Sequence, residues 1–469
     1  MTISEPQMHP KEPLTHIPSQ EFMEPDWQRI PGWRNVTRAE WEDALWQRKN
    51  GIEIKIDRAT GHLTGLEKLK EIFGNFIPDN LIESIRRDQM EFANMQIRVP
   101  PQMVNTMNIE NLWEDPVRRY MLTAADDRLR VFPWINHPKA HRDSLHEKDM
   151  WVRPGLVHRY PWKVLLEPQF ECPQFCGHCT RMDSVGADTP QVTKVKLLDP
   201  LTVRLKWAAE YLSAEAPQVR DLTFSGGDPV YFPIEKLEEY VYQILDEMPH
   251  IRDIRFGSKA LNGAPYQLLQ PKVLEGWRRI VQRAKERNVR MHFHTHINHV
   301  NQVTPVMRKV VDELRDMGFR DVRNQGVMLR GVNASVKDII NLCYALIFKA
   351  DITPYYFYIC DMVPNAEHWR TSVAETQDVQ LGVMGWFAGY YTPRFVCDAS
   401  FVGKRFIHQS AHYDRTYGIS YWTKTYHTAD DKDDPIALER AYPYYDPIYT
   451  LPPEGQVYWA KYLSAPVKV

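Results

Sequence analysis

The sequence lacks any long hydrophobic run and contains few cysteines. No apolar run among its 469 residues reaches the about 20 residues that a membrane-crossing helix needs. The first residues also lack the apolar segment of a secretory signal peptide. Six cysteines are too few for a disulfide scaffold in a chain of this length. We therefore expect a cytoplasmic protein that makes no use of a membrane.

A charge bias is missing as well. The chain has 58 basic and 60 acidic side chains, with a formal net charge of -2. This balance gives no reason to expect binding to nucleic acid or to an anionic surface. Hydrophobic residues make up 43% of the chain and charged residues 25%, which is typical of a globular protein with a large core. The length predicts two or three packed units, or one large domain with appendages.

Short apolar runs alternate with amphipathic helical patterns from about residue 160. The predicted strands are Lys163–Glu167, Arg220–Phe224, Asp253–Phe256, Val289–Phe293, Gly326–Leu329 and Pro354–Ile359. The predicted helices between them are Leu201–Ala214, Ile234–Met248, Lys272–Arg287, Thr304–Met317 and Val336–Phe348. This order predicts an α/β fold with a parallel sheet and crossover helices. The sheet is expected to form either a closed barrel or a partial one.

The composition divides the chain into four predicted parts. Residues 1–25 are expected to form a flexible arm, and residues 26–150 a helical region. Within that region, helices are predicted at Arg38–Lys49, Thr64–Ile72 and Asp79–Met95. Residues 151–400 hold the strand–helix alternation. Residues 401–469 are rich in aromatics and prolines and are expected to form an irregular extension.

Three of the cysteines are crowded into eight residues, directly after the first predicted strand. Cys172, Cys176 and Cys179 have the spacing C-x3-C-x2-C. Thiolates are soft ligands that suit iron–sulfur clusters or zinc. Three of them leave one iron of a 4Fe–4S cube open to the amino and carboxylate groups of S-adenosylmethionine, whose reductive cleavage yields a 5′-deoxyadenosyl radical. The alternative is a zinc knuckle completed by His178 in a non-enzymatic binding protein.

Other polar residues share this position at strand ends. Ser225, Gly226, Gly227 and Asp228 follow the second predicted strand. Their two glycines permit close approach of the backbone to a ligand such as the amine of S-adenosylmethionine. His296 follows the fourth strand and Asp361 follows the sixth, whereas Gln325 lies at the fifth. In βα barrels, the carboxyl ends of the strands build the active site.

Seven stretches occur in an order that is specific to one family. They are PGLVHRYPWKVLL, CPQFCGHCTR, TFSGGDPV, HTHINHVNQVT, NQGVMLRGVN, PYYFYICDMVPNAEHWRT and FVCDAS..GK. On these residues, the chain resembles the lysine 2,3-aminomutase family of radical SAM enzymes over about residues 25–405. The resemblance implies a partial (β/α)6 barrel that uses a 4Fe–4S cluster, S-adenosylmethionine and pyridoxal 5′-phosphate (PLP). It also implies an isomerase that moves an α-amino group to the β-carbon of an amino acid.

The resemblance assigns roles to individual residues. Lys404 is implied as the catalytic lysine that binds PLP, and a partly buried site that lowers its pKa would suit this role. Arg159 and Lys163 match PLP-binding positions, although Lys163 replaces an arginine and so puts a bidentate contact in doubt. Arg181 matches the position that pairs with the substrate carboxylate. The contacts implied for S-adenosylmethionine are Ser225, Gly226, Gly227, Asp228, His296, Asn298, Gln325 and Tyr358.

Two aspartates bear on the substrate and its partners. Asp361 and Asp398 match the positions that hold the distal ammonium of lysine, so the expected substrate is a small amino acid with a cationic side chain, lysine or arginine. A reductase electron donor such as flavodoxin or ferredoxin is implied as a partner. The family also leads us to expect a homo-oligomer.

The segment before Lys404 departs from the family. Lysine-specific members have a run of glycines there, whereas this chain has the bulkier Phe401 and Val402, in a segment that is one residue shorter. The PLP assignment is weakened accordingly. An alternative is a radical SAM enzyme on the same scaffold that catalyses epimerisation or elimination without PLP. The cysteines that bind a structural zinc in some members are missing after Cys397, so no such zinc is expected.

Overall fold

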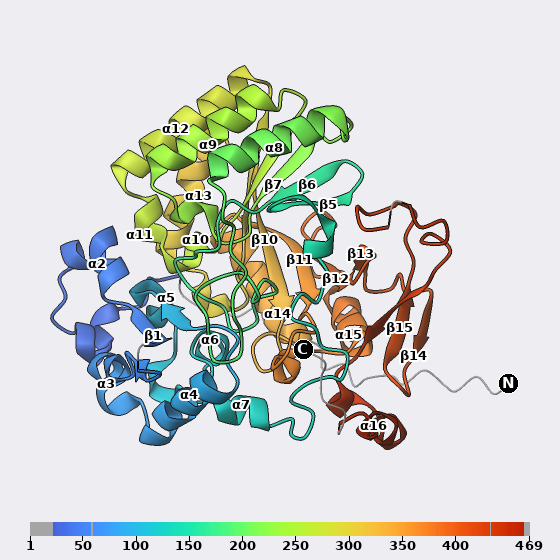
Figure 1. Ribbon diagram of the computed structural model, residues 1–469. Coiled ribbons are helices and arrows are strands. Elements are labelled where there is room, and N and C mark those ends of the chain that lie inside the picture. The colour runs from blue at the N-terminus through green and yellow to red at the C-terminus, as the bar shows by residue number, and fades with distance from the viewer. Residues whose placement is uncertain (1–21, 58–59, 432, 464–469) are drawn as a thin grey trace.

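A ten-stranded sheet with helices on one face forms the centre of the molecule (Figure 1). The computed structural model describes residues 22–57, 60–431 and 433–463. Most of the predicted arm, residues 1–25, therefore lies outside the described residues. The strand order is β13-β12-β11-β10-β9-β8-β7-β6-β5-β4. Neighbours from β6 to β12 pair in parallel, and the pairs at both edges are antiparallel. The predicted α/β class is confirmed.

All six predicted strands are present, and four others join them. The ten strands are β4 (Trp151–Arg153), β5 (Leu156–Tyr160), β6 (Lys163–Leu166), β7 (Asp221–Phe224), β8 (Asp253–Gly257), β9 (Arg290–Thr295), β10 (Asp321–Met328), β11 (Thr353–Ile359), β12 (Arg394–Ala399) and β13 (Gly403–Phe406). Strand β10 begins earlier than predicted because the buried Val322 and Asn324 alternate with the charged Asp321 and Arg323. Polar residues on one face hide a strand from a search for apolar runs.

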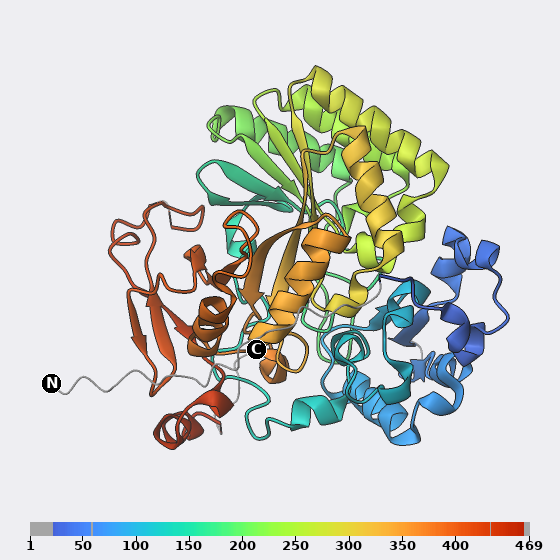
Figure 2. The same cartoon turned by 180° about the vertical axis from the view of Figure 1, so that it is seen from behind.

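The crossover helices cover the convex face of this sheet (Figure 2). They are α8 (Leu201–Ala214), α9 (Ile234–Glu247), α12 (Pro271–Glu286), α13 (Pro305–Met317), α14 (Val336–Tyr344) and α15 (Val373–Val383). The predicted helix Val336–Phe348 changes to a π-helical turn at Ala345–Lys349. Strand residues such as Phe224, Phe256 and Phe293 pack into the helix-facing core and are fully buried. No helix in the described part of the chain is long and apolar enough to cross a membrane.

The sheet curls strongly enough to bring distant strands together. The Arg159 guanidinium on β5 lies 2.8 Å from the Asp398 carboxylate on β12, although six strands separate β5 from β12 in the sheet. Tyr160 on β5 likewise accepts a hydrogen bond from the Lys404 amide on β13 at 3.0 Å. Among the described residues, β13 and β4 form the two edges and do not pair with each other. Side-chain contacts across the concave face therefore join strands that are not joined by backbone pairing.

The N-terminal region contains strands as well as the predicted helices. Its elements are α1 (Arg38–Trp41), α2 (Ala44–Lys49), β1 (Ile52–Ile56), β2 (Leu63–Thr64), α3 (Glu67–Phe73), α4 (Asp79–Glu91), β3 (Ile97–Val99), α5 (Pro101–Asn105), α6 (Pro116–Met121) and α7 (Ala125–Leu129). The sheet order β2-β1-β3 was not predicted. The single helix predicted at Arg38–Lys49 is divided because Asp43 caps α2, accepting from the Trp46 amide at 2.7 Å.

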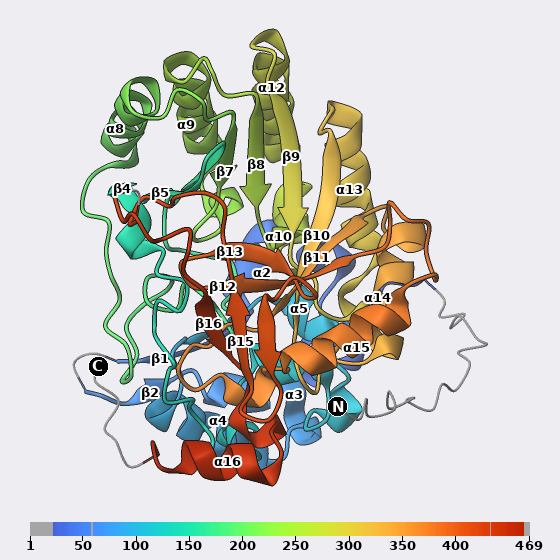
Figure 3. The same cartoon turned by 90° about the vertical axis from the view of Figure 1, so that its right-hand side faces the viewer.

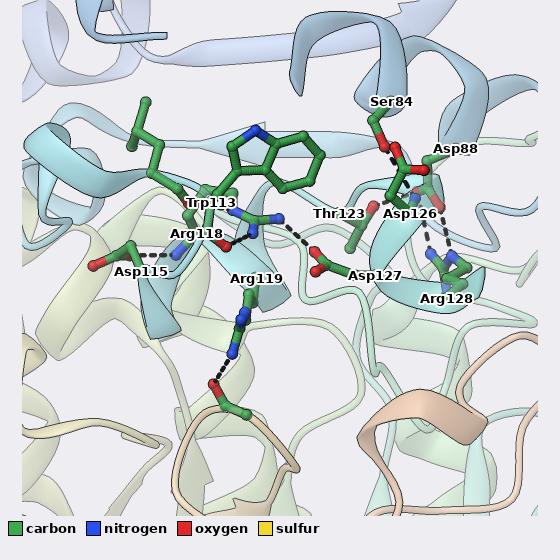
Figure 4. Close-up of polar contacts among 12 residues, drawn as sticks. Ser84, Asp88, Trp113, Asp115, Arg118, Arg119, Thr123, Asp126, Asp127 and Arg128 are labelled. Carbon is green, nitrogen blue, oxygen red and sulfur yellow. Dashed lines mark hydrogen bonds and ion pairs between the residues drawn. The ribbon is translucent and has the colours of Figure 1, made fainter. Parts of the chain in front are cut away.

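Buried ion pairs hold this region together (Figure 4). Arg118 on α6 pairs with Asp127 on α7 at 2.5 Å. Arg128 on α7 pairs with Asp88 on α4 at 2.5 Å, and the Thr123 hydroxyl also donates to Asp88. Arg119, on the other side of α6, donates to the Gly331 carbonyl at 3.0 Å, in the loop after β10. The N-terminal region is therefore bonded directly to the active-site end of the large sheet.

The C-terminal segment, residues 407–463, is not irregular as predicted. It forms a three-stranded antiparallel sheet of β14 (His412–Asp414), β15 (Ile419–Trp422) and β16 (Tyr442–Tyr445), followed by α16 (Pro453–Ala460) (Figure 3). Each strand is only three or four residues long, too short to show alternation in the sequence. The edge strand β16 also contains Pro443, whose ring side is exposed. The prediction of an irregular extension failed because it took the prolines as a sign that no strand forms, whereas proline is tolerated in an edge strand.

Candidate active site

The predicted site residues gather where the parallel strands end. The cysteine loop follows β6, residues 225–228 follow β7, His296 follows β9 and Asp361 follows β11. Lys404 and Asp398 approach from the β12–β13 hairpin, where they are directly opposite each other in register. The order of the strands in the sheet brings these loops to one end of the molecule.

The glycine turn after β7 supports the cysteine loop. The amides of Gly227 and Asp228 donate to the carbonyls of Gln169 and Glu171, at 2.7 and 2.8 Å. A Cβ at Gly227 would lie 2.5 Å from the Glu171 carbonyl oxygen, so only glycine permits this approach. On the opposite side, Arg98 of β3 donates to the Cys172 carbonyl at 3.1 Å. The turn therefore orients the loop, in addition to its predicted contact with S-adenosylmethionine.

The three thiols lie within electrostatic reach of one another. Burial raises the pKa of Cys172 well above its usual value, and the charges of Asp228, Cys179 and Cys176 add to this effect. Burial, together with the charge of Cys176, raises the pKa of Cys179 to about 11. Metal binding is what converts such thiols into thiolates. The donor set fits a group that supplies strong positive charge.

The zinc alternative would need four ligands gathered around one ion. Within residues 22–57, 60–431 and 433–463, no three His, Cys, Asp or Glu side chains are arranged to hold one metal ion. Thiolates of a 4Fe–4S cube bind different irons, so they lie farther apart than the four ligands around one zinc. His178, the fourth ligand of the zinc alternative, instead faces the His296 ring at 3.4 Å between their Nε2 atoms.

Lys259 is a site residue that sequence reasoning missed. Its Nζ lies 3.1 Å from the Cys176 sulfur and 4.7 Å from the centre of the Tyr120 ring. A cation in this place stabilises negative charge on the thiolates. The only feature of the sequence that could have indicated Lys259 was its position, two residues after the end of β8.

Lys404, whose side chain is 33% exposed, belongs to a group of charges centred on the buried Asp398. The Lys404 Nζ is 2.8 Å from one oxygen of Asp398, and the other oxygen of Asp398 accepts from Arg159 at 2.8 Å. Burial by itself lowers the pKa of Lys404, but the charge of Asp398 outweighs it and raises that pKa well above its usual value. The expectation of a lowered pKa is therefore wrong, because Asp398 stabilises the ammonium form.

Lys163 has the lowered pKa that was expected of Lys404. Burial, with the positive charges of Lys404 and Arg255, lowers the pKa of Lys163 to about 8. Its Nζ lies 4.1 Å from the centre of the Tyr160 ring, and the Lys404 Nζ lies 5.7 Å from the same ring. Tyr160, which was not singled out from the sequence, thus lies close to both amines.

Arg181 is bound by two carboxylates of the chain itself. Its Nε donates to Glu167 at 2.9 Å and its Nη2 to Glu147 at 3.0 Å. Trp151 donates to the second oxygen of Glu167 at 3.0 Å. Burial raises the pKa of Glu167 to about 7, although the Arg181 charge opposes this shift. Neither glutamate was predicted: Glu167 directly follows the stretch PGLVHRYPWKVLL and Glu147 lies seven residues before it, but no motif residue assigned a role to either.

Asp361 has less support than Asp398. The Thr180 hydroxyl donates to it, and burial together with the nearby charge of Asp398 raises the pKa of Asp361 to about 7. For Asp398, burial is outweighed by Arg159 and Lys404, which lower its pKa. The structure therefore brings the two aspartates together but gives them different charge states near neutral pH.

The residues predicted to contact S-adenosylmethionine fall into two groups. Tyr358 donates to Gln325 at 2.7 Å, and the Tyr358 ring lies 5.5 Å from the Lys404 Nζ. This pair therefore lies beside Lys404. His296 instead lies beside His178 in the cysteine loop. Asn298 accepts from the Val327 amide at 2.9 Å, and its buried Nδ2 has no partner in the part of the chain that is described.

The stretch Glu367–Arg370 has a structural role that the sequence did not show. Arg370 and Glu367 form a fully buried ion pair at 2.7 Å. Arg370 also donates to the Tyr444 hydroxyl at 3.2 Å and to the Tyr445 carbonyl on β16. This motif docks the C-terminal segment onto the loop after β11.

Comparisons with known proteins agree with the resemblance drawn from the motifs. No family model matches the chain. The L-lysine 2,3-aminomutase of Acetoanaerobium sticklandii is 32% identical over 367 residues, which cover 78% of this chain and 78% of that protein. Those of Fusobacterium nucleatum and Clostridium subterminale are each 32% identical, over 371 and 373 residues, and cover 78% of this chain and 76% and 78% of their own lengths. An Ignisphaera aggregans GH53 catalytic domain aligns with a TM-score of only 0.29 at 11% identity, over 57% of this chain and 88% of its own, too weak a likeness to bear on the fold.

These relatives show the family, whose members use a 4Fe–4S cluster, S-adenosylmethionine and PLP. The chain belongs to the lysine 2,3-aminomutase family of radical SAM enzymes.

Proposed function

We propose that this protein is a 2,3-aminomutase that moves the α-amino group of a cationic amino acid, lysine or arginine, to the β-carbon. The observation that carries the proposal is the group of Lys404, Asp398 and Arg159, with Asp361 beside it. A PLP-dependent reaction on a cationic substrate requires a lysine amine and carboxylates close together. Here Lys404 on the edge strand β13 and Arg159 on the antiparallel strand β5 meet Asp398 on β12.

The substrate is expected to lie between Arg181 and the two aspartates. Arg181 would bind the α-carboxylate, replacing one of its present partners, Glu147. Asp361 would accept the distal cation, because its own support is a single hydroxyl donor. A substrate with a carboxylate side chain would be repelled by Asp361 and Asp398.

The cysteine loop is proposed to hold the 4Fe–4S cluster through Cys172, Cys176 and Cys179. A cluster held there would supply the electron that cleaves bound S-adenosylmethionine into methionine and the 5′-deoxyadenosyl radical, the species that would remove the β-hydrogen. The turn Ser225–Asp228 keeps the loop in place, and Lys259 holds positive charge beside Cys176. His296, Asn298, Gln325 and Tyr358 remain proposed contacts to S-adenosylmethionine. The partner for this step is a reductase electron donor such as flavodoxin or ferredoxin.

Lys404 is proposed as the residue that anchors PLP, with Arg159 and Lys163 on its phosphate. PLP supplies an electron sink for the migrating nitrogen. Lys404 must lose a proton before its Nζ can act as a nucleophile. Asp398, which accepts a hydrogen bond from that Nζ, lies in position to take the proton. Lys163, with its pKa of about 8, keeps most of its positive charge near neutral pH.

The proposal also covers the fold, the cellular location and the oligomeric state. The curled parallel sheet is proposed to be the partial (β/α)6 barrel of the family, spanning residues 151–400, with a helical N-terminal region at 26–150 and a separate segment from 401 onward. The protein is proposed to be cytoplasmic and to form homo-oligomers. The contact between Arg159 and Asp398 across the sheet supports the barrel assignment.

Anaerobic reconstitution tests this function. The protein would be supplied with iron, sulfide, PLP, S-adenosylmethionine and a reductant, then incubated with lysine, arginine, ornithine and glutamate. We expect a β-amino product from lysine or arginine, and none from the Lys404→Ala variant. Zinc without iron or sulfide after anaerobic purification would instead support the zinc knuckle and overturn the proposal.

A second candidate is epimerisation or elimination on the same scaffold without PLP. It is favoured by the raised pKa of Lys404 and by the bulky residues before it. Substrate labelled with ¹⁵N and deuterium separates the outcomes. Migration keeps the nitrogen in the product on a new carbon, elimination releases it, and epimerisation leaves it on the α-carbon.

A further inference from the structure

The turn that leads into Lys404 is held by side chains from far along the chain. Residues 399–403 connect β12 to β13, and the C-terminal sheet lies beside these strands (Figure 3). The Lys424 ammonium donates to the Phe401 carbonyl at 2.7 Å. The Tyr426 hydroxyl donates to the Val402 carbonyl at 2.8 Å. Two consecutive carbonyls of the turn are therefore bound from the C-terminal segment.

The turn needs such support because its backbone is strained. Phe401 has a φ of 64°, a left-handed conformation that a bulky side chain rarely adopts. Strained positions of this kind persist only where the surroundings hold them in place. The Phe401 ring stacks on His146, with 4.2 Å between ring centres, and the Ser400 hydroxyl donates to the Ser144 carbonyl. The turn is thus held on both sides.

Lys424 is itself held rigidly. Its side chain is 0% exposed and forms an ion pair with Asp431. It also donates to the Thr428 hydroxyl at 3.2 Å. A buried ammonium with three partners of fixed position has little freedom to release the Phe401 carbonyl.

The Tyr426 hydroxyl packs against Gly403, the residue directly before Lys404. A Cβ at Gly403 would lie 2.9 Å from the Tyr426 hydroxyl and 2.8 Å from the Tyr160 hydroxyl, so both hydroxyls pack against this glycine. Tyr160 in turn accepts from the Lys404 amide at 3.0 Å. Three backbone groups between Phe401 and Lys404 are consequently bound by Lys424, Tyr426 and Tyr160.

We propose that Lys424 and Tyr426 are positioning residues that hold the 399–403 turn so that Lys404 faces Asp398 and the site. This inference rests on the proposed function of Lys404. The hairpin register places Lys404 opposite Asp398, and a change in the turn would move the ammonium away from the carboxylate. In this chain the C-terminal segment gives the turn a defined shape that flexible glycines would not.

The test compares Tyr426→Phe and Lys424→Met with matched controls in the full-length reconstituted protein. Tyr417→Phe removes a hydroxyl that donates to Glu454 at 3.1 Å, and Lys461→Met removes an ammonium above the Tyr458 ring. Both controls lie in the C-terminal segment and neither contacts the turn. Iron content, measured for every variant, should equal that of the parent protein.

Two measurements need no PLP. Amide hydrogen exchange in the peptide that covers residues 399–406 should rise about fivefold in the test variants, the factor for one lost hydrogen bond of typical strength. The rate at which an amine-reactive reagent labels Lys404 should also begin to rise at a lower pH, because a displaced Lys404 loses the stabilising charge of Asp398. Unchanged exchange and an unchanged labelling profile in both variants would overturn the inference.

A third measurement separates this inference from the proposed function. Borohydride would trap PLP on Lys404, and peptide mass spectrometry would quantify it. We expect a lower trapped fraction and a lower kcat in the test variants than in the controls. Absence of trapping in the parent protein would refute the function proposed for Lys404, while exchange and labelling would still decide whether Lys424 and Tyr426 position it. Normal trapping and kcat in a variant with raised exchange would also overturn the inference.

Discussion

Two groups of charges in this molecule are built differently. The N-terminal charge cluster consists of Asp88, Arg118, Asp127 and Arg128 (Figure 4). Arg118 pairs with Asp127 and also donates to the carbonyls of Leu112 and Trp113. In this cluster each buried arginine has its own carboxylate and carbonyls take the remaining donors, while the half-exposed Arg130 lies 3.4 Å from Asp127 as a further cation.

The Lys404 charge cluster consists of Arg159, Asp361, Asp398 and Lys404. Here two cations share one carboxylate, Asp398. The second carboxylate, Asp361, has a hydroxyl donor but, within the described part of the chain, no cation among its hydrogen-bond partners. The raised pKa of Asp361, about 7, is the electrostatic sign of this imbalance. The comparison indicates that the first cluster stabilises the fold, while the second leaves a place for a cation from outside the chain.

The largest effect is expected from breaking the N-terminal cluster. Asp88→Asn leaves Arg128 buried without its carboxylate, and removing one partner of a buried pair costs about 3–5 kcal/mol of unfolding free energy. Urea denaturation followed by tryptophan fluorescence would measure the loss. An unchanged denaturation midpoint would contradict the view that this cluster is structural.

The same substitution in the Lys404 cluster should act on binding instead of stability. Asp361→Asn removes a charge that repels Asp398, so the unfolding free energy should not fall. The KM for lysine or arginine should rise about tenfold to a hundredfold, the range for losing a hydrogen bond to a charged group. If Asp361→Asn were as destabilising as Asp88→Asn, the two clusters would not differ in the way proposed.

Asp361 should also make binding depend on pH. It faces Thr180, Asp398, Glu147 and Lys404, and its pKa is about 7. Below that pH it is neutral, so affinity for a cationic substrate should improve by up to about tenfold per unit as the pH rises toward 7. The substrate KM between pH 5.5 and 8 would show this trend, which Asp361→Asn should remove.

The same pKa has the opposite effect on stability. Because folding raises the pKa of Asp361, the folded state binds more protons than the unfolded state between about pH 4 and 7. The contribution of Asp361 to stability is therefore present at low pH and lost as the pH rises through about 7. Denaturation midpoints of the parent and Asp361→Asn proteins should thus diverge across this interval.

The smallest effect on the unfolding free energy is expected for an ion pair on the surface. Arg278 and Glu313 form an ion pair at 2.6 Å on the surface, where both side chains are partly exposed. Arg278→Gln should change the unfolding free energy by less than about 1 kcal/mol, as is usual for such pairs. The urea experiment used for Asp88→Asn measures it directly, and a loss as large as that of Asp88→Asn would mean that the assay does not report burial.

Local patterns in the sequence predicted the repeating part of the fold. Five of the six crossover helices and six of the ten strands of the large sheet follow from periodicity, and α8 has the predicted bounds. The spacing of Cys172, Cys176 and Cys179 predicted a cluster-binding loop. Strands β4, β5 and β13 were missed, since they pair only with antiparallel neighbours at the edges, and β12, which pairs in parallel with β11, was missed together with the helix α15 before it.

The sequence by itself determined the order of the strands and helices, the chemical types of the site residues and the family, because these depend on residues close together in the chain. Only the tertiary structure decided which charges meet. Lys404 is paired with Asp398, Lys259 with Cys176, and Arg181 with Glu147 and Glu167. The pKa of Lys404 is raised instead of lowered for the same reason. Electrostatic energy depends on distance and burial in space, and neither can be read from positions along the chain.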